Sequence, residues 1–148
     1  MTAATLPARP IRAPLSRAAR RLGGGAALLL AWSGIGGIVS VRQGANTWAD
    51  AWSASATLAA PWPMILVQLA AAAVAVLGRG RPAITGTAVL LLAAFLSAIS
   101  GFFDGQFARE GLSPAYVVLQ TALITTAAGV VVLAALRLRE LVALRRAR

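Results

Sequence analysis

The chain of 148 residues contains no cysteine and no histidine. The absence of cysteine excludes disulfides and thiol catalysis, and the absence of histidine excludes imidazole metal ligands. Haem ligation by either residue is excluded as well. Neither a phosphate-binding glycine loop nor a zinc motif is present. We therefore expect no metal site and no cofactor, and we expect that the protein is not an enzyme.

Carboxylates are scarce, and the four that occur are Asp50, Asp104, Glu110 and Glu140. All four lie outside the long apolar stretches of the chain. Ion-coupled carriers need ionisable groups inside the membrane. The placement of the carboxylates therefore argues against a proton- or sodium-coupled carrier, including the small four-span multidrug exporters, which depend on a membrane-embedded acid.

Apolar residues make up 59% of the chain and charged residues 12%, against roughly 45–50% and ~25% in ordinary soluble domains. Four apolar stretches are present, most of them close to the ~20 helical residues that a bilayer requires. The first follows a basic segment, as in a secretory signal, but it is longer than a signal core. The sequence predicts an all-α integral membrane protein, a four-transmembrane-helix bundle with spans at about 22–41, 62–77, 83–103 and 116–136.

All fourteen basic residues are arginines, and twelve of them fall in three segments, 1–21, 78–82 and 137–148. Short segments rich in arginine remain in the cytoplasm. We therefore expect a multi-pass protein of the cell inner (plasma) membrane with both termini cytoplasmic and the 42–61 and 104–115 loops outside. The abundance of Ala, Gly and Arg is typical of GC-rich bacterial coding.

The net charge of +10 raises the question of a polyanionic partner. The aromatic residues of the chain are not interleaved with the arginines as nucleic-acid stacking requires, so we expect no nucleic-acid binding. Anionic lipid headgroups at the cytoplasmic face are the better partner. Residues 1–21 are expected to form a disordered basic tail, and residues 137–148 a basic amphipathic tail on the headgroups.

The stretch "NTWADAW", residues 46–52, places Trp48 and Trp52 four residues apart, and Trp62 follows. Tryptophan prefers the headgroup level of a membrane, so all three are candidate interfacial anchors. The spacing of the first two, with Asn46 or Thr47 as a cap, predicts a short interfacial helix at about 47–59. It is interpreted either as part of an ordinary aromatic belt or as a lid or partner-docking surface.

Several polar residues lie inside the apolar stretches at a similar distance from the outer face. They would form a polar layer in the outer third of the bundle. The layer has two interpretations, hydrogen bonding between helices or a small outward-facing pocket for a lipid or another small molecule. The residues are Ser40, Gln68, Ser97, Ser100 and Gln120.

Small residues also recur four apart within the spans, which allows helices to approach closely in lipid. One such series is Thr121, Thr125 and Gly129. Two functions remain open. The first is a non-enzymatic membrane protein that acts by association with itself, as a homo-oligomer, or with a membrane-protein partner. The alternative is a carrier or binder of a small neutral or lipidic molecule in the outward-facing polar pocket.

Overall fold

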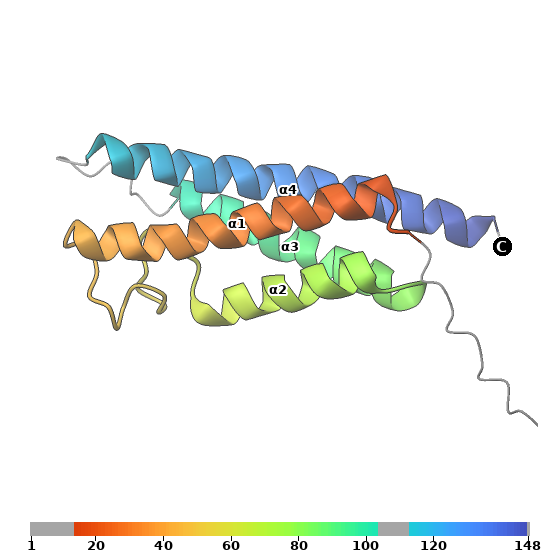
Figure 1. Ribbon diagram of the computed structural model, residues 1–148, viewed down its shortest axis with the longest axis horizontal. Helices are drawn as coiled ribbons and strands as arrows, with labels where there is room; N and C mark the ends of the chain where they lie inside the picture. Colours follow the sequence, from red (N-terminus) through yellow and green to blue (C-terminus); the bar gives the residue numbers. More distant parts are fainter. Residues whose placement is uncertain (1–13, 104–112, 148) are drawn as a thin grey trace, which may run out of the picture.

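The computed structural model describes residues 14–103 and 113–147, and these residues form four α-helices and no strand. The helices run roughly along one common direction (Figure 1). The predicted all-helical chain with four helices is confirmed. The helices are α1 (Arg17–Arg42), α2 (Trp62–Leu77), α3 (Arg81–Phe103) and α4 (Pro114–Arg146).

Consecutive helices alternate in direction, and each packs against its two neighbours, so that α1 also contacts α4 (Figure 1). The start of α1 and the end of α4 therefore lie at the same end of the bundle. Residues 43–61 lie at the other end, which we call the loop end. The contact between α1 and α2 is the least extensive of the four.

Three of the described helices, α1, α3 and α4, are long and apolar enough to cross a membrane, with 26, 23 and 33 residues. The second helix has only 16 residues, which corresponds to about 24 Å of helix against the ~30 Å hydrocarbon core of a bilayer. Figure 1 shows α2 starting well short of the loop end of α1. Residues of the 43–61 loop lie where additional turns at the start of α2 would otherwise be.

Local sequence signals explain where the helices begin. The hydroxyl of Ser16 accepts a hydrogen bond from the Ala19 amide (3.2 Å), and the hydroxyl of Ser113 accepts one from the Tyr116 amide (3.3 Å). Both serines thus satisfy amide groups that a helix start leaves open. In the short connection between α2 and α3, Gly80 adopts a φ of 61°, which glycine tolerates without strain.

The main core is built largely from alanine, because close helix contacts leave little room for longer side chains. On α2, Ala71, Ala72 and Ala75 are buried. A Cβ atom added at Gly86 of α3 would lie 2.9 Å from the Ala75 amide nitrogen and 2.8 Å from Val74. The absence of a side chain at Gly86 therefore sets the close approach of α2 and α3.

The end opposite the loop is held by a polar cluster that joins α1 to α4. Buried Arg137 donates to Glu140 (2.7 Å) and to the hydroxyl of Ser16 (2.9 Å), and that hydroxyl donates in turn to Glu140 (3.2 Å). Residues 137–146 are an unbroken continuation of α4, and residues 17–21 belong to α1. The expected tails are therefore helical in these parts, while residues 1–13 lie outside the described residues.

The predicted interfacial helix at 47–59 is wrong. This segment is a series of turns, in which the amides of Asp50, Ser53 and Ala56 each donate to the carbonyl three residues earlier. The side chain of Asn46 accepts from the amide and the hydroxyl of Thr57 (3.2 and 2.7 Å). A straight helix would hold these residues about 16 Å apart. The hydrogen bonds of Asn46 therefore require a folded loop, as side chains of this type often do.

Candidate functional site

The 43–61 loop folds back along α1 and packs on a part of its surface where the residues are glycines. A Cβ atom added at Gly36 would overlap the carbonyl oxygen of Leu58, and one added at Gly37 would overlap the indole of Trp52. Ser33 fixes the loop further by accepting a hydrogen bond at its hydroxyl from the Ala60 amide (3.2 Å). The loop thus reaches nine residues back from the end of α1 at Arg42, about 13 Å along the helix.

The three tryptophans named as interfacial anchors form one row, with Trp48 and Trp52 in this loop and Trp62 at the start of α2. The rings of Trp48 and Trp52 lie 6.5 Å apart, and those of Trp52 and Trp62 lie 6.1 Å apart. Trp48 and Trp62 are more than half exposed, whereas Trp52 is partly buried against α1 and donates its indole N–H to the carbonyl of Ser33 (3.3 Å). Trp52 therefore fastens the loop to the bundle instead of sharing a helical face with Trp48.

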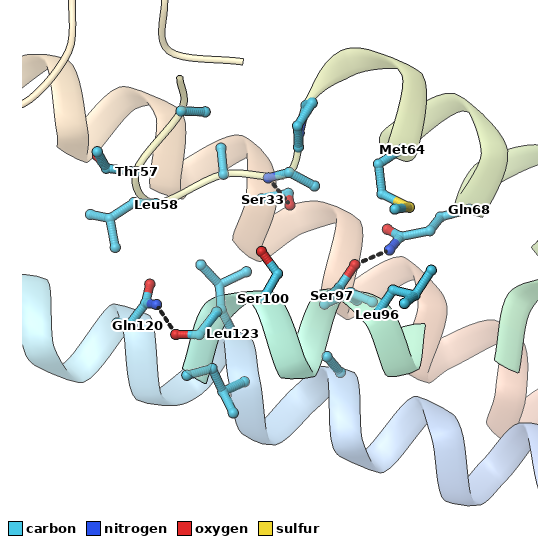
Figure 2. A pocket seen from close by; sticks show the side chains of 18 of the residues that line it. Ser33, Thr57, Leu58, Met64, Gln68, Leu96, Ser97, Ser100, Gln120 and Leu123 are labelled. Carbon is cyan, nitrogen blue, oxygen red and sulfur yellow. Dashed lines mark hydrogen bonds between the residues drawn. The ribbon is translucent and has the colours of Figure 1, made fainter. Parts of the chain in front are cut away.

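A cavity of about 680 Å³ lies beneath the docked loop. This volume is in the range of pockets that hold small molecules. The loop forms one wall, and all four helices contribute to the others (Figure 2). The lining residues are Leu29 and Ser33 of α1, residues 54–61 of the loop, Met64 and Gln68 of α2, Leu96, Ser97, Ile99, Ser100 and Gly101 of α3, and Gln120, Leu123, Ile124 and Ala127 of α4.

Two buried amides line this cavity, and each is bonded to α3. The amide nitrogen of Gln68 donates to the Ser97 hydroxyl (2.8 Å), and that of Gln120 donates to the Gly101 carbonyl (2.7 Å). Only 2% of Gln68 and 3% of Gln120 is exposed. In Figure 2 the two amides flank Ser100, which lies between them on α3. Helix α3 therefore organises the polar part of the cavity.

The carbonyl oxygen of Gln68, Oε1, is buried and has no hydrogen-bond partner within the described parts of the chain. The described residues around the cavity include no charged and no aromatic side chain. The cavity is therefore a neutral space with an apolar wall and few polar groups. Such a space favours an uncharged occupant, since an unpaired charge is costly to bury.

Four of the five residues expected in a polar layer, Gln68, Ser97, Ser100 and Gln120, line this one cavity. The structure does not bring Ser40 to them. Its buried hydroxyl donates to the Gly37 carbonyl of its own helix (2.8 Å), and its backbone carbonyl accepts from the loop amides of Ala45 and Asn46 (2.8 and 3.2 Å). Ser40 is therefore not among the residues that line the cavity.

Sequence reasoning missed Ser33 and the loop residues 54–61 as lining groups. The one available signal was that Ser33 and Gly37 lie four residues apart, which indicates a close contact of α1 with another segment. That segment is the loop. Thr121, Thr125 and Gly129, whose spacing was expected to allow close approach of another helix, all lie on the exposed face of α4.

Within residues 14–103 and 113–147, no three side chains of His, Cys, Asp or Glu gather as metal ligands would. No protein-family model matches the chain, and no curated protein or solved structure matches it either.

Proposed function

We propose that the protein is a four-span protein of the inner membrane that binds a small neutral or lipidic molecule in the cavity under the 43–61 loop. Both termini are cytoplasmic in this proposal, and the loop end faces outward. The observation that carries it is the cavity of about 680 Å³ that Gln68 and Gln120 line together. A bundle that acted only by association would need no such space.

The course of the loop supports the same proposal. With α1 spanning the membrane, the contacts of Ser33 with the loop lie well below the outer end of that helix. Non-helical backbone at membrane depth is tolerated only where it is buried in protein or lines a cavity that admits water. Residues 54–61 line the cavity. A short α2, with loop residues in place of its missing first turns, is therefore consistent with a binding site at this depth.

A change of cavity volume tests this function. Met64 lines the cavity, and Figure 2 shows its side chain next to Gln68. We expect Met64→Trp to fill this space and to remove a molecule that co-purifies with the wild type. Leu66→Trp is the matched control, because Leu66 is 59% exposed on the same helix.

The measurement is native mass spectrometry of protein extracted from its own membrane in polymer-bounded discs. The wild type and Leu66→Trp should carry the same small molecule at one copy per chain, and Met64→Trp should have lost it. Identical bound species in all three proteins would contradict the proposed function.

One observation favours a second candidate function, association through α4. Thr121, Thr125 and Gly129 form an exposed stripe, and a Cβ atom built on Gly129 meets no atom within 4 Å in the described parts of the chain. Exposed small residues at this spacing let a second membrane helix approach closely.

The replacement Gly129→Leu tests this second candidate, with Val132→Leu as the control, because Val132 is also exposed on α4. Cross-linking in native membranes should give a dimer, or a complex with a partner, that is lost only in Gly129→Leu. Equal cross-linking in both variants would exclude an interface at the stripe.

A further inference from the structure

Gln68 combines burial with an unused acceptor. Its side chain lies in a bundle interior with 2% exposure, and its amide nitrogen is engaged by Ser97 at 2.8 Å. Its Oε1 atom has no donor within the described residues, although Gln68 belongs to the lining of the cavity. Figure 2 shows the amide on the side of Gln68 that faces the other lining residues.

A buried carbonyl oxygen without a donor destabilises the fold, and buried polar groups are almost always paired. The hydrogen bond to Ser97 holds the amide in place, so that the free oxygen keeps its direction. We infer that Gln68 Oε1 is the specificity determinant of the cavity and accepts a hydrogen bond from a hydroxyl group of the bound molecule. This inference rests on the proposed function and names the class of its ligand.

The remaining lining narrows that class further. No lining residue among those described is charged, so an ionised headgroup such as a phosphate or carboxylate would have no counter-ion. Aromatic side chains, which bind quaternary ammonium groups, are also missing from the described lining. Leu29, Leu96 and Leu123 offer apolar contacts instead. The ligand is therefore an uncharged amphiphile with a hydroxyl head and an apolar body, such as a long-chain alcohol or a partly acylated glycerol.

Gln120 provides the matched comparison within the same cavity. It is buried to a similar extent, but its amide nitrogen donates to the backbone carbonyl of Gly101 and thereby joins α4 to α3. Its oxygen is not among the buried polar atoms that lack a partner in the described residues. Replacing Gln120 should affect helix packing alone, whereas replacing Gln68 should also affect the choice of ligand.

A pair of probes that differ only in the donor tests the inference. Diazirine-bearing 1-decanol and its methyl ether are titrated against the full chain in phosphatidylcholine nanodiscs, with concentrations corrected for partition into lipid. Adducts on residues 54–68 and 96–101 report occupancy of the cavity. The alcohol should reach half-saturation at a roughly tenfold lower concentration than the ether, because one additional hydrogen bond raises the affinity by about this factor.

Two variants complete the experiment. In Gln68→Met the alcohol should bind only as well as the ether, and in Gln120→Met the preference for the alcohol should remain. Equal labelling of the wild-type cavity by both probes would overturn the inference and leave the proposed function standing. Saturable labelling by neither probe would count against the proposed function and the inference together.

Discussion

Gly36 is the residue on which the docking of the loop depends most. Its missing side chain leaves the space that the carbonyl oxygen of Leu58 occupies, and backbone cannot move aside as a flexible side chain can. Gly34 lies on the same helix, but a Cβ atom there meets nothing within 4 Å among the described atoms. Replacing each of these two glycines therefore distinguishes the steric requirement at the loop contact from the low helix propensity that both glycines share.

We predict that Gly36→Ala destabilises the protein, while Gly34→Ala is neutral or stabilising. Alanine favours a helix over glycine by about 1 kcal/mol, whereas forced overlap in a packed site costs roughly 1–3 kcal/mol. Thermal unfolding in detergent measures the stability, and acrylamide quenching reports release of Trp52 from α1. Equal behaviour of the two variants would show that the loop does not rest on Gly36.

The two buried glutamines should contribute independently to stability. Gln68 and Gln120 donate to different groups of α3, the Ser97 hydroxyl and the Gly101 carbonyl. We expect Gln68→Leu and Gln120→Leu each to change the free energy of unfolding by about 1 kcal/mol, and the double variant to show their sum. A coupling above about 0.5 kcal/mol would indicate a shared network instead.

At the scale of elements, length and hydropathy were enough to predict the helices, because a membrane-spanning helix must satisfy its own backbone. The second helix was predicted at 62–77 and lies at Trp62–Leu77. The 47–59 segment could not be predicted from spacing, because its conformation is set by Asn46 and by contacts with α1 that are distant in sequence. Local helix signals at Trp48 and Trp52 were overridden by this packing.

The loop predicts a graded exposure to water that an interfacial helix would not give. The chain has no cysteine, so single cysteines can be placed at Ser53, which does not line the cavity, and at Ala59, which lines it. Both should react with a small membrane-impermeant thiol reagent, and only Ala59→Cys should be slowed by a bulky one. Identical rates for both sites and reagents would contradict a recessed cavity.

At the scale of the whole molecule, the fold gathers positive charge at one end. The start of α1, the α2–α3 turn and the end of α4 carry arginines such as Arg20, Arg79 and Arg145, whereas Arg42 lies at the loop end. This asymmetry underlies the proposed orientation. In intact cells, an impermeant reagent should therefore label Ser53→Cys and leave Gly80→Cys unmodified until the membrane is opened. The reverse pattern would invert the proposed topology.

The candidate site was predictable only in part, because some of its residues are brought together by contacts between segments that are distant in sequence. The depth of Gln68, Ser97, Ser100 and Gln120 along their helices follows from sequence, and the structure places all four around one cavity. The contribution of the loop, and the separation of Ser40 from the cavity, depend on how far residues 43–61 fold back along α1. That distance is a property of the packed molecule and leaves no periodic pattern in the sequence.

The most direct test of the central claim is the stabilisation of delipidated protein by the neutral fraction of a membrane lipid extract. A molecule that binds only the folded state raises stability with its concentration, by about 2.7 kcal/mol at a hundred times its Kd. We predict a saturable rise in the unfolding temperature of the wild type and of Leu66→Trp, and none in Met64→Trp. An equal rise in all three proteins, or no rise in any, would contradict a binding cavity beneath the loop.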